Sequence, residues 1–89
     1  MANIYKFLNT QITLNGTGST VNSANLVRIC HEGTGSTSHI ITQKYANGAI
    51  RSTFTIMAQT EIIIEKDTTD TLTVDGGTDV TANRIAYKN

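Results

Sequence analysis

The chain has 89 residues, which predicts one small domain, residues 1–89, with a thin margin of stability on its own. Seven basic residues balance seven acidic residues, and this neutral charge argues against a nucleic-acid partner. One cysteine excludes a disulfide within the chain and a metal cluster built from its cysteines. Because no apolar run approaches the roughly 20 residues of a membrane span and no signal-peptide pattern opens the chain, we expect neither a membrane partner nor classical secretion.

The first third of the chain reads as short strands joined by a polar loop. Residues 4–8 form an apolar cluster that is compatible with a strand or a single helical turn. A strand is predicted over 10–15, because Ile12 and Leu14 alternate with polar residues. Gly, Ser, Thr and Asn dominate residues 15–25, which predicts a loop.

A second strand follows this loop over ANLVRICHEG. Its alternation predicts one face with Leu26, Arg28 and Cys30, and an opposite face with Val27, Ile29 and His31. The segment EGTGST at 32–37 is a second connection, and HIITQKY then resumes as a strand.

The clearest local signal is Asn47-Gly48, which lies between two strand-like runs. Asn-Gly tolerates the positive φ angles of a type I′ turn, so residues 39–57 are predicted to form a β-hairpin. Its second arm is expected to direct Ile50, Ser52, Phe54 and Ile56 to the core, and Arg51, Thr53 and Thr55 away from it.

Three further strands are expected in the last third of the chain. They are EIIIE at 61–65, TLTVDGG with Leu72 and Val74 directed inward, and RIAYKN with Ile85 and Tyr87 on one side. Six to eight short strands without a convincing helix predict an all-β protein, an antiparallel sandwich or small barrel. The chain has no proline, so its edge strands must be protected by charge, twist or a neighbouring chain.

One group of side chains resembles a metal site or a Cys/His nucleophile pair: Cys30, His31, Glu32 and His39. On a strand, Cys30 and His31 point to opposite faces and cannot approach one ion together. We therefore expect no metal or cofactor, with Cys30 as a small buried apolar residue and the histidines at strand ends or interfaces. A ring of His31 or His39 around an axis shared by several subunits is the alternative, which zinc calorimetry would test.

Two glycine-rich segments, residues 15–20 and 33–37, share the string Gly-Thr-Gly-Ser-Thr. A phosphate-binding loop joins such a turn to a helix N-terminus, usually with a lysine. Neither string is followed by a lysine or a helical pattern. Both are therefore predicted to be surface loops.

Acidic side chains flank the most apolar run of the chain, in residues 61–65. On a strand, Ile62 and Ile64 would share one face, with Glu61 and Glu65 on the other. A catalytic pair of carboxylates would need a concave pocket and aromatic side chains to fix a substrate. The chain has five aromatic residues and no tryptophan, so we expect no catalytic residue here.

The residues that follow are typical of a structural turn. Asp and Thr side chains accept hydrogen bonds from backbone N–H groups two or three residues further along the chain. Asp67, Asp70 and Thr71 are therefore predicted to hold a turn that returns Leu72 and Val74 to the core.

At these positions the chain resembles a family of short structural proteins of tailed phages, especially those that infect marine cyanobacteria. The resemblance extends from end to end and rests on MANIYKFLNTQITLN, EIIIEKDTTDTL and RIAYKN, with matching positions at 4–7, 25–29, 65–72 and 85–87. Thr68 departs from the family pattern, which often has proline there, and Cys30-His31 has no counterpart in it.

The resemblance implies a virion protein associated with the capsid or the tail, made in the host cytoplasm and assembled in repeated copies. Its partners would be further copies of itself, as a homo-oligomer, or other virion proteins. The lack of a catalytic constellation agrees with a non-enzymatic structural role. The side chains expected in the core or an interface are Tyr5, Phe7, Phe54, Ile62, Ile64 and Tyr87; of these, Tyr5, Phe7 and Tyr87 would pack near joined chain ends.

Two alternatives belong to other functional classes. A small β domain could present the loops at 15–25 and 32–38 to a carbohydrate or a host surface, although few aromatics are available for sugar stacking. A small enzyme would need Glu61, Glu65 or His31 in its chemistry. Alanine substitution there would then abolish activity and leave the fold intact.

Overall fold

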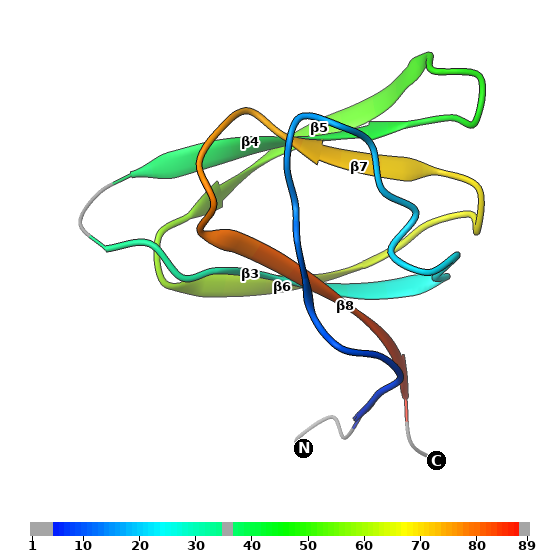
Figure 1. Cartoon of the computed structure of the whole chain (residues 1–89), viewed down its shortest axis with the longest axis horizontal. Coiled ribbons are helices and arrows are strands. Elements are labelled where there is room, and N and C mark those ends of the chain that lie inside the picture. The colour runs from blue at the N-terminus through cyan, green and yellow to red at the C-terminus, as the bar shows by residue number, and fades with distance from the viewer. Residues whose placement is uncertain (1–4, 35–36, 88–89) are drawn as a thin grey trace.

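The computed structural model describes residues 5–34 and 37–87, which form eight β-strands and no helix (Figure 1). The strands are β1 (Tyr5–Phe7), β2 (Ile12–Thr13), β3 (Leu26–His31), β4 (Ser38–Lys44), β5 (Ile50–Met57), β6 (Thr60–Glu65), β7 (Thr71–Val74) and β8 (Val80–Tyr87). The prediction of an all-β protein is confirmed. Within the described ranges there is no helix of the length and apolar character that crossing a membrane requires.

The strands form two antiparallel sheets that pack face to face. One sheet has the order β1-β8-β3-β6, with β2 also paired to β8, and the other has the order β5-β4-β7. The sheets do not close on each other, so of the two predicted architectures the sandwich is the observed one (Figure 1).

The core lies between the sheets and follows from the alternation of side chains along the strands. On β3, Val27, Ile29 and His31 are buried, while the residues between them are only partly buried, as the sequence predicts. On β7, Leu72 and Val74 are buried as predicted. The remaining buried apolar residues of this core are Leu14, Val21, Ala24, Ile41, Ile56, Val80 and Ala82.

The predicted hairpin is present as β4 and β5, and its tip projects from the body of the sandwich (Figure 1). The turn type differs from the prediction. Gly48 N–H donates to Tyr45 O, Tyr45 N–H donates to Ala49 O, and in this turn only Gly48 has a positive φ, of 91°. A type I turn followed by a left-handed glycine therefore replaces the expected type I′ turn, in which both central residues need positive φ.

A β-bulge reverses one expected side-chain direction in this hairpin. Gln43 pairs with Ser52 but Lys44 pairs with Ile50, so Arg51 is an extra residue on β5. One extra residue in a strand turns the side chains beyond it to the opposite face of the sheet. Ile50 accordingly faces outward and is 64% exposed. The prediction that Ile50 faces the core is wrong, whereas Phe54 packs against the core.

The two ends of the described chain are joined as β1 and β8. Tyr5 pairs with Tyr87 and Phe7 with Ile85, which places both ends of the described chain at the bottom of Figure 1. Phe7 is exposed, with the Arg28 guanidinium 5.6 Å from the centre of its ring. Ile4, Lys88 and Asn89 lie outside the described residues, as do the side chains of Tyr5 and Tyr87.

Three strands differ in extent or burial from the expectations. β2 contains only two of the residues predicted over 10–15, and β8 begins at Val80, earlier than the predicted strand of RIAYKN. On β6, Ile64 packs against the core, but Ile62 is 37% exposed. Because β6 is a sheet edge, Ile62 lies at the rim of the core instead of inside it.

Candidate functional site

Asp67 and Asp70 lie in the turn between β6 and β7. Asp70 N–H donates to Asp67 O over 3.0 Å, and Asp67 N–H donates to the Asp70 carboxylate over 3.3 Å. The side-chain bond runs from Asp70 back to a residue earlier in the chain, whereas the sequence predicts bonds to later N–H groups. Thr71 begins β7 directly after this turn.

The Asp70 carboxylate is buried and binds two side chains from the β4–β5 hairpin. It accepts hydrogen bonds from Gln43 Nε2 at 2.9 Å and from Arg51 Nη1 at 2.8 Å. Arg51 also donates to Asp67 at 2.9 Å. The bulge at Arg51 therefore directs its guanidinium to the acidic turn.

Lys66 is buried on the other side of the same turn. Its ammonium donates to Asp67 O at 3.1 Å and to Asp70 O at 3.0 Å. Burial lowers the pKa of Lys66, while the charges of Asp70 and Asp67 oppose that change.

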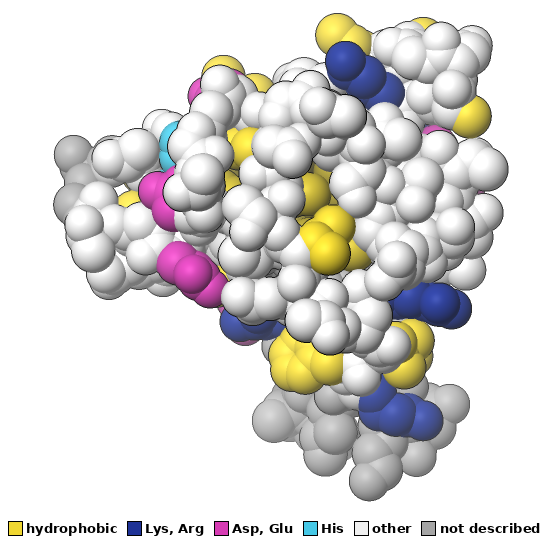
Figure 2. All heavy atoms as spheres, in the orientation of Figure 1, with side chains coloured by type: hydrophobic (Ala, Val, Ile, Leu, Met, Phe, Trp, Pro, Cys, Tyr) yellow, Lys and Arg dark blue, Asp and Glu magenta, His cyan; other side chains and the backbone are white. Residues whose placement is uncertain are grey.

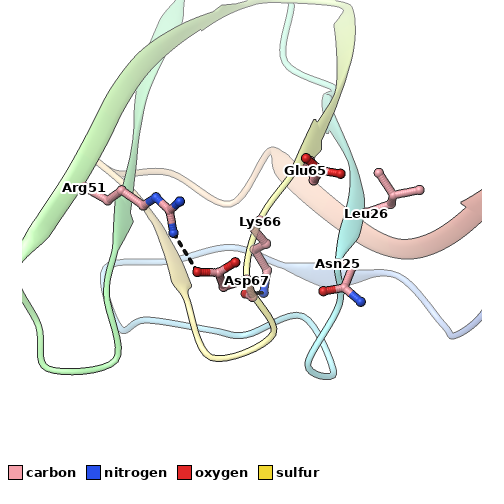
Figure 3. A pocket seen from close by; sticks show the side chains of 6 residues that line it. All are labelled: Asn25, Leu26, Arg51, Glu65, Lys66 and Asp67. Carbon is pink, nitrogen blue, oxygen red and sulfur yellow. Dashed lines mark hydrogen bonds and ion pairs between the residues drawn. The ribbon is translucent and has the colours of Figure 1, made fainter.

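A hollow of about 430 Å³ opens beside this network (Figure 3). In Figure 3, Arg51 and Asp67 point toward each other, and Lys66 lies beside Asp67. Glu65 also lines the hollow, whereas Glu61 pairs with Arg28 on the outer side of the sheet. The two glutamates therefore do not converge, and the other charged groups are engaged in holding the turn.

A second polar cluster lies at the end of the sandwich where four chain segments meet. β3 ends at His31, and β4 carries His39 near its start. Antiparallel pairing brings the end of β7 beside the start of β4, and the start of β8 beside the end of β3. The connection from β7 to β8, with Asp75 and Asp79, therefore joins the two histidines (left side of Figure 1).

His39 is held between two carboxylates. Its Nδ1 lies 2.8 Å from Asp75 Oδ1, and its Nε2 lies 2.9 Å from Asp79 Oδ1. Because carboxylates only accept, both ring nitrogens carry protons in this arrangement. The hydrogen bond to Asp75 is the main cause that raises the pKa of His39, and it lowers the pKa of Asp75 in return.

His31 is fully buried beside His39, with 4.7 Å between the ring centres. Its Nδ1 accepts a hydrogen bond from Gly33 N–H over 3.0 Å and lies 4.0 Å from Asp79 Oδ2. The proton of a neutral His31 ring is therefore on Nε2, and this buried atom has no hydrogen-bond partner among the described residues.

The sequence correctly separates Cys30 from His31 on β3, but the expectation of a buried Cys30 is wrong, because Cys30 is on the outer face and only partly buried. The sequence does not anticipate that His31 and His39 meet within one chain, or that Asp75 and Asp79 join them. The sequence signal that could have revealed them is the pair of aspartates in DGGTD, where the predicted strand TLTVDGG ends. Glu32 is exposed and contributes no side chain to this cluster's hydrogen bonds.

We predict that Gly33→Ala disrupts the histidine cluster. An added Cβ would lie 2.4 Å from Asp79 Oδ2 and 2.5 Å from His31 Cε1, closer than atoms can approach. Because the His31 ring is buried and cannot move freely, we expect the melting temperature to fall by about 5–20 °C, as for an overpacked core site. Thermal denaturation measures the loss, and the NMR signals of the His31 ring should shift.

Gly16→Ala is the matched control, because a Cβ there meets nothing within 4 Å. We expect its melting temperature to equal that of the wild type or to be slightly higher. Equal stability of the two alanine variants would contradict the close packing of Gly33 against the cluster.

Most of the exposed large apolar side chains among the described residues belong to the segment from β4 to β6. Seven large apolar side chains are notably exposed among the described residues, and two of them are Phe7 and Leu8 near the N-terminus. The other five belong to β4, β5, β6 and the hairpin turn: Ile40, Tyr45, Ile50, Met57 and Ile62. In Figure 2, hydrophobic side chains are visible on the projecting hairpin and at the opposite end near the chain termini.

Among the described strands, β5 has the longest unpaired edge. β5 pairs with β4 on one side and with no other described strand. Its eight residues contain no proline and one charged residue, Arg51, whose guanidinium is bound by Asp67 and Asp70. Such an edge presents unpaired backbone groups to a further strand.

No family model, curated protein or solved structure matches this chain.

Proposed function

We propose that the protein is a non-enzymatic structural subunit that assembles with further copies of itself along the edge of β5. The observation that carries the proposal is this edge: eight residues long, unpaired among the described strands, and flanked by the exposed side chains of Ile50 and Met57. Strand addition at an open edge provides main-chain hydrogen bonds, and the apolar side chains at its ends add buried area.

A second copy suits this edge better than a charged partner. The single charge on β5 is already neutralised within the chain, so two identical edges can meet without repulsion. The formal net charge of zero likewise gives no long-range attraction for a strongly acidic or basic partner. Two β5 strands in antiparallel pairing would form a self-complementary interface with two-fold symmetry.

The setting that we propose is the virion of a tailed phage, in the capsid or the tail, after synthesis in the host cytoplasm. Its support is the resemblance of residues 4–7, 25–29, 65–72 and 85–87 to short structural proteins of such phages. Further virion proteins would then be the second class of partner. Repeated copies in a particle would also offset the thin stability margin of a domain of this size.

The test is the mass of the purified protein in solution, measured by light scattering over a range of concentrations. We expect a defined oligomer. Thr53→Lys combined with Thr55→Lys, two exposed positions on β5, should weaken association by at least about 100-fold, because like charges brought together at an interface cost several kcal/mol.

Thr13→Lys combined with Thr17→Lys adds the same charge at exposed positions elsewhere and is the control. It should leave the mass unchanged. A wild-type monomer at every concentration, or equal dissociation of both double variants, would overturn assembly through β5. Binding to a glycan array by such a monomer would favour the carbohydrate-binding alternative.

A further inference from the structure

We propose that His31, His39 and Asp79 bind a divalent transition-metal ion, and that Zn²⁺ is the ion that fits these donors best. One ligand atom from each of the three side chains lies within 4.8 Å of the other two. In Figure 2, the histidine colour is visible at the left end of the molecule with acidic side chains beside it. The proposal concerns a site within one chain and is independent of the assembly through β5.

The distances are close to those of ligands around one ion. Two donors bound to Zn²⁺ at about 2.1 Å lie about 3.0–3.4 Å apart. His39 Nε2 and Asp79 Oδ1 are already 2.9 Å apart, and His31 Nδ1 is 4.0 Å from Asp79 Oδ2. The three donors lie within 4.8 Å of one another, so the partly exposed Asp79 side chain would have to move toward the buried His31 by about 1 Å to complete a three-ligand set.

A histidine at position 31 costs stability in the fold as described. It is the third inward-facing residue of β3, after the apolar Val27 and Ile29. Its ring is fully buried and leaves Nε2 without a partner among the described residues, which costs stability. A bound ion would coordinate Nδ1 in place of Gly33 N–H, and the Nε2 proton would have no partner among the described residues in either state.

Asp75 orients one of the proposed metal ligands, His39. It holds His39 Nδ1 through a hydrogen bond of 2.8 Å, which orients the ring and leaves Nε2 for the ion. Metal-binding histidines almost always donate their other N–H to a carboxylate, a carbonyl or a water in this way. The ion would take the place of the proton that His39 Nε2 now shares with Asp79.

Access and donor chemistry favour the same class of ion. The Asp79 side chain is 34% exposed, so an ion can enter from that side and water can complete its coordination. Two imidazoles and one carboxylate suit Zn²⁺, Co²⁺ or Ni²⁺, whereas Ca²⁺ and Mg²⁺ prefer oxygen donors alone.

The first experiment uses the full wild-type chain without an affinity tag and titrates it with Zn²⁺ in a calorimeter. We expect one ion per chain. At about 100 times its dissociation constant, Zn²⁺ should raise the melting temperature by about 10 °C or more, because it binds only the folded arrangement. Co²⁺ should give a visible absorption spectrum of a site with nitrogen ligands, and Ca²⁺ and Mg²⁺ should give neither heat nor stabilisation.

Variants assign the ligands. His39→Asn and Asp79→Asn should remove binding, and Asp75→Asn should weaken it by about 10–100-fold, because Asp75 only orients His39. Two variants are the controls and should bind Zn²⁺ as the wild type does. Glu32→Gln changes an exposed acid near the cluster, and Cys30→Ser removes the nearest thiol.

Several outcomes would overturn the proposal. One is a wild-type chain that shows no heat and no stabilisation with Zn²⁺, Co²⁺ or Ni²⁺; another is binding that survives both His39→Asn and Asp79→Asn. Loss of binding in Cys30→Ser would move the site to the thiol. If a ligand variant does not fold, the Co²⁺ spectrum of the wild type still decides, because a spectrum without nitrogen ligands contradicts a site at the histidines.

Discussion

Replacement of Asp70 by asparagine is expected to lower the melting temperature by about 15 °C or more, as for a broken buried ion pair in a small domain. Asp70 is 1% exposed and joins the β6–β7 turn to the β4–β5 hairpin through Gln43 and Arg51. Asparagine keeps the shape but removes the negative charge. Arg51 and the buried Lys66 then lose the carboxylate that compensates them.

The same carboxylate gives stability a defined pH dependence. Burial alone would raise the pKa of Asp70, but hydrogen bonds from Gln43 and from Asp67 N–H, together with Arg51, lower it below its usual 3.8. A lowered folded-state pKa means that the stabilisation is present above the unfolded pKa and is lost as the pH falls through the folded pKa. Wild-type protein should therefore lose thermal stability below about pH 4 more steeply than Asp70→Asn does.

The control for this prediction is Asp67→Asn. Asp67 binds the same guanidinium, but its side chain is 72% exposed, where ion pairs contribute little. We expect the melting temperature of Asp67→Asn to be only a few degrees below that of the wild type. Asp75 also has a lowered pKa, and since it is present in all three proteins, the difference between the wild type and Asp70→Asn isolates Asp70. Equal melting temperatures for the Asp67 and Asp70 variants would contradict the central role of Asp70.

Leu72→Ala is expected to have the second large effect, a loss of about 2–5 kcal/mol in the free energy of unfolding. Leu72 is fully buried on β7, and its backbone is hydrogen-bonded in both directions to Ser19. Truncation leaves a cavity between the two sheets at a point where the long β2–β3 connection is attached. The free energy of unfolding of a small domain is only about 5–15 kcal/mol in total, so this loss is a large share of its stability.

Urea denaturation of Leu72→Ala measures this loss, and Leu8→Ala is its matched control. Leu8 is the same residue type but is 45% exposed, so its truncation should cost about 1 kcal/mol or less. A midpoint shift no larger for Leu72→Ala than for Leu8→Ala would show that Leu72 does not hold the two sheets together.

Much of the fold is encoded locally and could be predicted from the sequence. Alternation in a strand has a period of two, so Val27 and Ile29 on β3, and Leu72 and Val74 on β7, were assigned to the core without a structure. Asn47-Gly48 predicted the β4–β5 hairpin because few residues accept a left-handed conformation. These signals act over a few residues, within reach of a sequence pattern.

Local patterns failed where one residue or one neighbouring strand changed the outcome. The extra residue at Arg51 turned Ile50 outward, and no pattern in the hairpin announced it. Ile62 has the same alternation as Ile64, yet its exposure depends on the position of β6 at a sheet edge. Both outcomes follow from strand pairing, which joins residues that are far apart in the chain.

By itself, the sequence determined the all-β class, most of the strands and the position of the acidic turn, because backbone preferences and side-chain alternation act locally. Only the tertiary structure decided that a sandwich forms instead of a barrel, and that β5 is left as an open edge. It also brought His31, His39, Asp75 and Asp79 to one place, although His31 and Asp79 are 48 positions apart along the chain. Antiparallel pairing in both sheets places those segment ends together, and no spacing within the sequence records it.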